Sequence, residues 1–318
     1  MRITGQLIDT ASGAHIWADR FDGALDDIFD LQDQVAASVV GAIEPRLRQS
    51  EIERATRKPT ESLDAYDLYL RALSQFHKYT EESIREAIAL IKRALAIDPT
   101  YAPAASMIGW CRTFQRLQGW GSLSEAEVAE AVGLARQAIE AGKDDPDALW
   151  MAANPLSFFA GDHATAADAV DRALKLNPSS AHAWLVRAFV SYRQNQPDGA
   201  IEALQRAMQL SPLDPLNWIF TGGLAGYHVI AGRYEEAIEW AGRSLRQMPR
   251  YESALRNKVV ACAHLGRIEE ARDGLEQLLK LQPGLTVAQY DITYGTVFSP
   301  QIHAVYLEGL RKAGLPEG

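Results

Sequence analysis

The chain is poor in the residues that build metal and redox sites, because only two of its 318 residues are cysteine. Cys111 and Cys262 stand far apart in the sequence, and no Cys-x-x-Cys pair occurs. Two thiols are too few for a structural zinc site. We therefore expect both cysteines to be small buried side chains in a reducing compartment, and we predict no metal and no cofactor.

Long apolar runs are also missing, since none approaches the ~20 residues that a membrane-spanning helix needs. Met1 is followed by a strand-like stretch rather than by the charged and apolar regions of a signal peptide. The net charge is −9, the pI is near 5.3, and positive charge is not clustered. Nucleic acid and anionic lipid require concentrated positive charge. These observations predict a cytoplasmic protein that binds neither nucleic acid nor membrane.

The sequence patterns of known catalytic sites are absent as well. The seven histidines form no HExxH motif, and neither a Walker motif nor GxSxG occurs. Gly119-Trp120-Gly121 has the form GxG, but no strand precedes it, so it is a poor phosphate cradle. We predict that this chain is not an enzyme and that the purified protein shows no cyclase, hydrolase or phosphotransfer activity.

What the sequence does contain is alanine at almost every turn, with few runs of Val, Ile and Thr. This composition favours helix, because alanine loses no side-chain entropy there. The prolines recur at a nearly constant interval: 34 residues separate Pro178 from Pro212, 37 separate Pro212 from Pro249, and 34 separate Pro249 from Pro283. Such a period is typical of a helix–turn–helix repeat.

Segments 147–180, 181–214 and 252–285 align on these prolines and share one pattern of side-chain size. A fourth segment lies between the last two and carries three inserted residues. In all four, position 4 carries a large residue and position 20 a small one: Trp150, Trp184, Trp218 and Leu255 against Ala166, Ala200, Ala237 and Ala271. The small residue lets the second helix approach the first, and the large one fills the wedge between neighbouring pairs. Proline ends the second helix. Glycine stands at the turn within a pair, at Gly161, Gly232 and Gly266.

On these residues the chain resembles the tetratricopeptide-repeat family over roughly residues 63–285. We expect about six helix pairs within residues 61–285, of which those at 66–99 and 102–146 are degenerate. The predicted fold class is mostly α, an α-solenoid of tetratricopeptide helix pairs wound into a right-handed superhelix. Residues 286–318 are expected to form a linker and then a capping helix over 300–313, because the last repeat needs a cover.

The amino-terminal residues follow a different pattern. Residues 2–9 and 15–22 alternate apolar and polar side chains around a turn signal, which predicts a β-hairpin. Residues 26–57 predict a long helix. An isolated hairpin is marginal in water, so we expect its edge to pair with more sheet or with another chain, with self-association as one result.

The stretch QLIDTASGAHIWADRFDGALDDIFDLQDQVAASVVGAIEPRL resembles the end of a TolB-like amino-terminal domain. In bacteria that domain joins tetratricopeptide repeats to class III adenylate/guanylate cyclases or to transcriptional regulators with winged-helix output domains. The resemblance implies that residues 1–60 are a truncated TolB-like segment and that any cyclase or output domain lies upstream.

The repeat pattern also predicts a binding surface. The first helices of such pairs line the concave side of the stack, where this chain places large apolar and aromatic residues and two arginines. We predict a groove for a protein or peptide partner formed by Trp110, Met151, Phe158, His182, Leu185, Phe189, Tyr192, Arg193, Ile219 and Arg256. Arg193 and Arg256 would meet acidic groups of the partner. The alternative is that several of these residues only pack against neighbouring helices.

Three functions fit the sequence. The leading hypothesis is a protein–protein interaction scaffold or regulatory module. The second is the non-catalytic regulatory half of a class III adenylate/guanylate cyclase or of a transcriptional regulator. The third is a role in export or pilus assembly.

Overall fold

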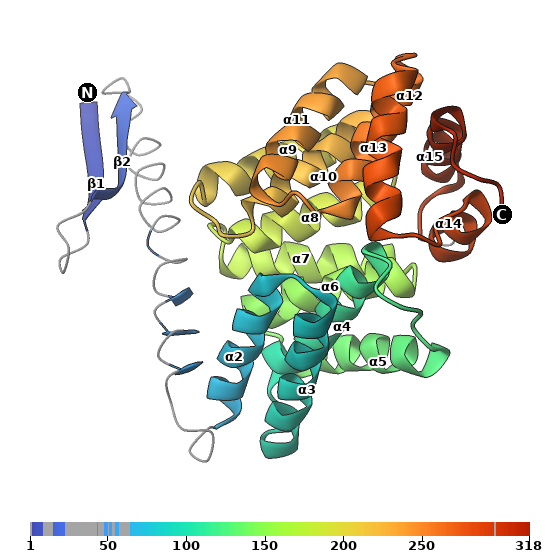
Figure 1. The fold of residues 1–318 in the computed structure, drawn as a ribbon. Coiled ribbons are helices and arrows are strands. Elements are labelled where there is room, and N and C mark those ends of the chain that lie inside the picture. The colour runs from blue at the N-terminus through green and yellow to red at the C-terminus, as the bar shows by residue number, and fades with distance from the viewer. Residues whose placement is uncertain are drawn as a thin grey trace.

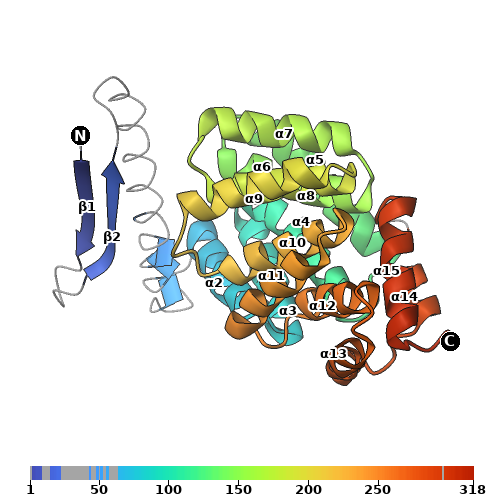
Figure 2. The ribbon, with the colours of Figure 1, turned by 90° about the horizontal axis from the view of Figure 1, so that it is seen from above.

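The computed structural model describes residues 2–8, 15–22, 43, 48, 49, 51, 52, 55, 56, 64–295 and 297–318. The elements in these residues are two strands followed by fourteen helices (Figure 1). The helices follow one another around a curved stack, which Figure 2 shows from above. The prediction of a mostly helical solenoid of paired helices is confirmed.

Six pairs of consecutive helices make up the stack, and the two helices of each pair pack closely against each other. In chain order the pairs are α2 (Ala65–Lys78) with α3 (Glu81–Ile97), α4 (Ala102–Leu117) with α5 (Glu125–Ala141), α6 (Pro146–Phe159) with α7 (His163–Leu176), α8 (Ala181–Arg193) with α9 (Pro197–Leu210), α10 (Asn217–Ile230) with α11 (Tyr234–Gln247), and α12 (Glu252–His264) with α13 (Ile268–Leu281).

Side chains at the helix starts explain several of these boundaries. Asp64, Thr80 and Ser124 each accept a hydrogen bond from the backbone N–H three residues later, which satisfies a donor that the helix itself leaves unpaired. At α5 the Glu127 carboxylate in turn accepts from the backbone N–H of Ser124 at 2.9 Å. This reciprocal cap sets the start of α5 after the long loop that makes the second repeat irregular.

Glycine and alanine take the positions that the repeat pattern gave them. The backbone at Gly161, Gly232 and Gly266 has φ between 62° and 75°, a left-handed conformation that favours glycine. The four small residues at position 20 have no exposed surface: Ala166, Ala200, Ala237 and Ala271. The second helix of each of these pairs can therefore approach the first closely.

The stack curves so strongly that its first pairs contact its last ones. Tyr79, at the end of α2, makes an edge contact with the Trp218 ring of α10 at 4.3 Å between ring centroids. Gln118, just after α4, donates from Nε2 to Ser253 Oγ of α12 at 3.1 Å. Gln282, just after α13, donates from Nε2 to the Gln118 carbonyl at 2.8 Å. These contacts close the concave side.

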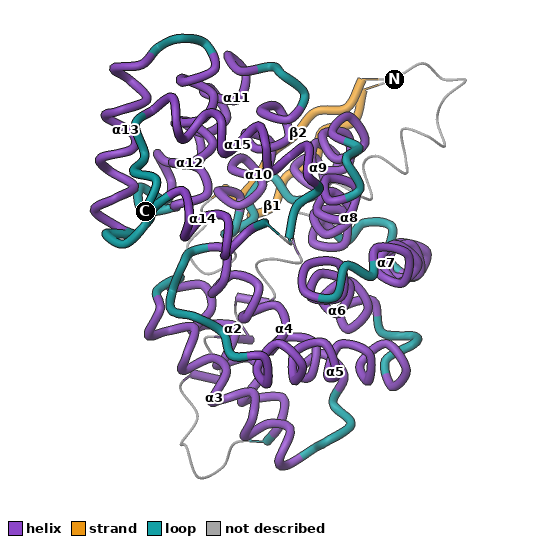
Figure 3. The backbone as a smooth tube through the Cα atoms, turned by 90° about the vertical axis from the view of Figure 1, so that its right-hand side faces the viewer, coloured by secondary structure: helices purple, strands orange, loops and turns teal. Residues whose placement is uncertain are grey.

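Two further helices follow the last pair, and Figure 3 shows them beside α12 and α13. The segment expected as a linker forms α14 (Val287–Tyr294), and α15 (Pro300–Ala313) packs on α12 and α13. A Cβ added at Gly309 of α15 would lie 2.7 Å from Val260 Cγ1, so glycine lets the two helices touch. The predicted capping helix over 300–313 is confirmed.

The strands β1 (Arg2–Ile8) and β2 (His15–Asp22) form the predicted antiparallel hairpin, which lies apart from the helical stack in Figures 1 and 2. The helix expected over 26–57 falls mostly outside the described residues. Of its described part, Ile52 and Ala55 are buried against the repeats, and Arg48 pairs with Asp147 of α6 at 3.0 Å. Among the described helices, none has the length and apolar character needed to cross a bilayer.

Candidate functional site

The ten residues predicted to form a groove lie on α4, α6, α8, α10 and α12, the first helices of five pairs. Three of them belong entirely to the core: Met151, Leu185 and Ile219. Five more are buried along the inner side: Trp110, Phe158, Tyr192, Arg193 and Arg256. Only His182 and Phe189 keep partial exposure. Most of the predicted residues are therefore buried in the described structure rather than exposed in an open groove.

An aromatic cluster joins four of the predicted residues. The rings of Trp110 and Phe189 stack at 6.3 Å between centroids. The Arg193 guanidinium lies over the Phe158 ring at 5.0 Å and over the Phe189 ring at 5.8 Å. Such cation–π contacts favour a guanidinium that has lost its water. Phe189 is the member of this cluster that keeps partial exposure.

Arg193 is a buried cation, and its polar protein contact is a neutral one. Its Nη2 donates to Asn154 Oδ1 at 3.0 Å, and no carboxylate of the described residues lies within ion-pair distance. Burial lowers the pKa of Arg193 to about 10. The charge is therefore held in the interior by aromatic faces and one amide.

Arg256 occupies the opposite part of the interior. Its Nη2 donates to the Tyr294 hydroxyl at 3.0 Å, and Tyr294 donates to the Leu117 carbonyl at 3.0 Å. Its guanidinium also lies 4.6 Å from the centre of the Tyr294 ring. One turn earlier on α12, burial raises the pKa of Glu252 to about 7, although Arg256 and the hydrogen bond from Gln282 act in the other direction. The carboxylate nearest to Arg256 is thus a weak counterion near neutrality.

The sequence reasoning missed the tyrosines that complete this interior. Tyr290, Tyr294 and Tyr306 come from α14 and α15, and all three are buried on the inner side. Tyr306 donates to Asn257 Oδ1 at 2.6 Å. The signal in the sequence was the spacing of Tyr290 and Tyr294, which puts two large rings on one helix face.

These residues enclose a cavity of about 90 Å³, hereafter the inner cavity. It lies between the first helices of the later pairs and the two carboxyl-terminal helices. Its walls include four residues predicted for the groove, together with tyrosines and phenylalanines from elsewhere in the chain: Phe189, Tyr192, Arg193, Arg256, Phe114, Tyr227, Tyr251, Tyr290, Phe298 and Tyr306. The cavity wall thus combines two cations with several hydroxyl groups.

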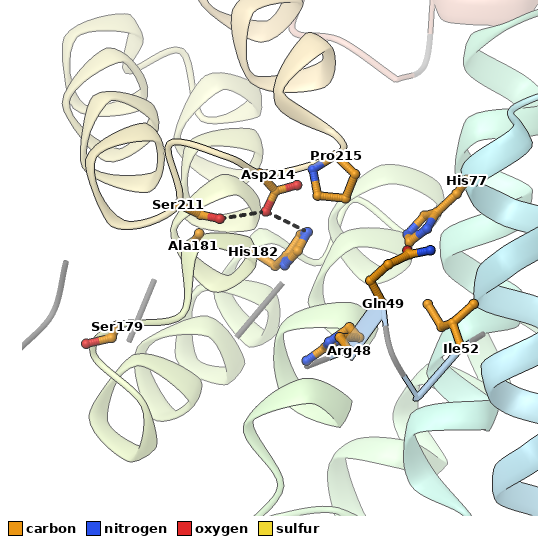
Figure 4. Close-up of a pocket in the computed structure, with 10 residues that line it drawn as sticks. All are labelled: Arg48, Gln49, Ile52, His77, Ser179, Ala181, His182, Ser211, Asp214 and Pro215. Atoms are coloured by element: carbon orange, nitrogen blue, oxygen red, sulfur yellow. Dashed lines mark hydrogen bonds and ion pairs between the residues drawn. The ribbon is translucent and has the colours of Figure 1, made fainter. Parts of the chain in front are cut away.

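A second, smaller cavity of about 40 Å³ holds the predicted residue His182 (Figure 4). Ser211 Oγ donates to Asp214 Oδ2 at 3.1 Å, and His182 Nε2 lies 3.7 Å from the same oxygen. His77 faces this cavity, and burial followed by the charge of His182 lowers the pKa of His77 to about 4. The other predicted residues do not reach this cavity.

The hydrogen bonds at this second cavity do not fit nucleophilic catalysis. A serine nucleophile needs a hydrogen bond to a base, but Ser211 bonds to the carboxylate and not to His182. In addition, the described residues contain no group of three or more histidine, cysteine, aspartate and glutamate side chains that could hold a metal. Cys111 and Cys262 are both buried and unbonded, as expected.

Comparison with known proteins supports the repeat assignment. The sequence model of the tetratricopeptide repeat matches residues 158–215, 192–251 and 231–285. A protein of Rhizobium meliloti (strain 1021) named "Putative adenylate cyclase 3" is 32% identical over 158 residues, which cover 50% of this chain and 27% of the relative. The human FK506-binding protein-like is 28% identical over 126 residues, 38% of this chain and 36% of the relative. The matched regions thus span about a third or less of these relatives.

Solved structures show the same fold at low sequence identity. The human IFIT1 dimer superposes with a TM-score of 0.59 at 14% identity and covers 92% of this chain and 74% of that one. The Cut9–Hcn1 heterotetramer of the APC/C gives 0.53 at 13% identity and covers 89% and 49%. Together with the six helix pairs and their 34-residue period, these findings establish that residues 158–285 consist of tetratricopeptide repeats.

Proposed function

We propose that this chain is a protein-interaction module that binds a protein or peptide partner. The observation that supports it is the solenoid of tetratricopeptide pairs, which builds a long surface from a rigid framework. At the second cavity Ser211 bonds to Asp214 and not to a base, and Ser157, which does hydrogen-bond to His163 at 2.9 Å, is buried. Neither arrangement therefore favours nucleophilic chemistry over binding.

The partner contacts the mouth of the inner cavity in this proposal. Phe189 is partly exposed there and is held by the Trp110 ring and by Arg193. Aromatic and arginine residues often supply most of the binding energy at protein interfaces. The buried members of the predicted set then act by fixing Phe189 in place.

Substitution of Phe189 tests this proposal. Phe189→Ala should weaken capture of a partner about thirtyfold, because a truncated aromatic anchor commonly costs ~2 kcal/mol or more. Partners are first identified by mass spectrometry after capture on the immobilised chain, and each is then purified and titrated. Leu176→Ala is a matched control, since Leu176 is an exposed apolar residue at the end of α7.

A thermal melt of each variant separates binding from packing. If Phe189 is a binding residue, the two variants melt alike and only Phe189→Ala loses the partner. If Phe189→Ala lowers the melting temperature sharply while its affinity equals that of Leu176→Ala, Phe189 is a packing residue and the proposed surface is wrong.

The regulatory half of a class III cyclase is the second candidate. The 32% identity to a protein named as an adenylate cyclase favours it over a role in export or in a transcriptional regulator. Residues 1–60 as a TolB-like segment, with repeats at 61–285 and a capping region at 286–318, would fit that arrangement. The coding sequence immediately upstream decides this candidate: a cyclase domain in frame supports it, and a stop codon or an unrelated domain excludes it.

Two further expectations belong to this proposal. The chain acts in the cytoplasm, and the outer edges of the β1–β2 hairpin provide a site for self-association, because strand edges offer unpaired backbone groups. Light scattering should then give more than one chain per particle for the full-length protein and one chain per particle for a variant that lacks residues 1–22. The same number of chains per particle in both proteins would count against the hairpin as an interface.

A further inference from the structure

Four buried polar atoms without a partner belong to side chains that line the inner cavity. They are Arg193 Nη1, Arg256 Nε, Tyr227 OH and Tyr290 OH, and within the described structure none of them has a hydrogen-bond partner. All four residues line the inner cavity and are at least nine-tenths buried. A buried donor without a partner destabilises the folded state, and more so when it is charged. Four such donors on residues of one cavity wall indicate that the cavity is built to bind a ligand.

The hydrogen-bonding capacity of the four atoms restricts the class of ligand that the cavity can bind. The two guanidinium groups can only donate hydrogen bonds, and the two hydroxyl groups can donate as well. A ligand that satisfies all four must therefore present acceptors. An ionised carboxylate is such a group, because its two oxygens offer about four acceptor positions and suit the fork of an arginine.

The balance of charges in the interior also indicates a negatively charged ligand. Arg193 has no carboxylate within ion-pair distance among the described residues, and Arg256 has Glu252 as its nearest acidic neighbour on α12. Two buried cations therefore face one carboxylate. Removing a cation from water costs several kcal/mol unless an anion compensates it. A ligand with a single negative charge makes the interior neutral when Glu252 is ionised.

The walls and the volume define the rest of the ligand. A cavity of about 90 Å³ has room for roughly six water-sized positions. That is enough for a small organic molecule and too little for a segment of peptide. Phe114, Phe189 and Phe298 supply apolar surface beside the cations. Such walls suit a short hydrocarbon body better than inorganic phosphate, whose charge is fully hydrated in water.

We propose that the inner cavity is a binding site for a small monocarboxylate, held by Arg193 and Arg256 with hydrogen bonds from the hydroxyl groups of Tyr227 and Tyr290. The apolar body of the ligand lies against the phenylalanine rings. Because Tyr290 belongs to α14 and the other three residues belong to α8, α10 and α12, the ligand also ties the carboxyl-terminal helices to the repeats. This site goes beyond the proposed function, since it needs no protein partner.

The first test compares a carboxylate with its neutral amide. Propionate and propionamide have nearly the same size and shape, so only charge and the acceptor set differ between them. Titration of the full chain with sodium propionate should raise the melting temperature in a saturable way, because a ligand that binds the folded state stabilises it. Propionamide and sodium phosphate at equal ionic strength should leave the melting temperature unchanged.

Substitutions then show which residues the stabilisation by propionate depends on. Arg193→Met and Arg256→Met should each weaken propionate binding about tenfold or more, as expected for the loss of a charged hydrogen bond. Arg193→Met should also melt at or above the temperature of the wild type without ligand, because methionine replaces an uncompensated buried charge. Arg136→Met on the exposed face of α5 is the matched control and should bind propionate like the wild type.

Several outcomes overturn the site. Equal effects of propionate and propionamide would mean that charge plays no part, and no effect of either would mean that only water fills the cavity. A larger effect of phosphate would replace the organic ligand with an inorganic one. If Arg256→Met does not fold, Arg193→Met with Arg193→Lys still decides the result: binding in Arg193→Met equal to the wild type contradicts the proposal. None of these readouts involves a partner protein, so the site and the proposed function can fail separately.

Discussion

The buried carboxyl group of Glu252 gives a prediction about stability and pH. Only 4% of Glu252 is exposed, and burial raises its pKa to about 7 from the ordinary value of 4.5. A raised pKa in the folded state means that the folded state prefers the protonated form. Its contribution to stability is therefore fully present below pH 4.5 and is lost as the pH rises through 7.

The size of the effect follows from the two pKa values. One pKa unit corresponds to about 1.4 kcal/mol, so the contribution of Glu252 should fall by about 2–3 kcal/mol between pH 5 and pH 8. Other groups change stability in the same range. The pKa of His77 is lowered to about 4, so its contribution to the stability of the protein increases as the pH rises and opposes that of Glu252. The effect of Glu252 must therefore be measured as a difference between two proteins.

Glu252→Gln provides that comparison. The amide has the shape of the carboxyl group, its oxygen can still accept the hydrogen bond from Gln282, and it does not titrate. Urea unfolding at pH 5 and pH 8, followed by circular dichroism, should show the wild type losing about 2–3 kcal/mol relative to the variant. Parallel dependence of the two proteins on pH would refute the reasoning and place Glu252 in contact with water.

Three substitutions test the packing. Trp110→Ala should cost about 3–5 kcal/mol in urea unfolding, because Trp110 is buried against the Trp150 ring at 5.3 Å between centroids; a cost near zero would mean an open groove. Gly309→Ala should cost about 1–3 kcal/mol and speed proteolysis of α15, since the new Cβ meets Val260; unchanged protection would show that α15 shifts freely. Gly266→Ala should cost about 1–2 kcal/mol in a thermal melt, because φ is 75° there; an unchanged melt would contradict that turn.

The sequence predicted the features that depend on neighbouring residues. Helix pairs follow from the 34-residue spacing of Pro178 and Pro212, and the turns within pairs follow from glycines such as Gly232, because both act on the local backbone. The start of α5 at the cap of Ser124 is equally local. These features could be read without knowing how the pairs stack.

The candidate site could be predicted only in part, because it depends on how far the stack curves. Curvature is the sum of small rotations from one pair to the next, and no local pattern gives that sum. Tyr79 and Trp218 touch across more than one hundred residues of sequence, and this contact hides the predicted groove. The tyrosines of α14 also lie in the interior because the stack curves so far, which no local pattern indicates. Phe189, Tyr192, Arg193 and Arg256 were identified, but the cavity that they share was not.

Closure of the stack is the central claim, because the inner cavity exists only if the first and last pairs meet. Chemical cross-linking tests it directly. Gln118 and Ser253 hydrogen-bond across the closure through their side chains, so Gln118→Cys with Ser253→Cys should be joined within one chain by a short bismaleimide, whose spacer replaces the length of the lost side chains. Arg187→Cys with Asp171→Cys, whose native side chains pair at 2.8 Å between neighbouring helices, is the control that the same reagent should also join in an open stack. Rapid cross-linking of both pairs is the result we predict; cross-linking of the control pair alone would show that the stack is open and contradict the account.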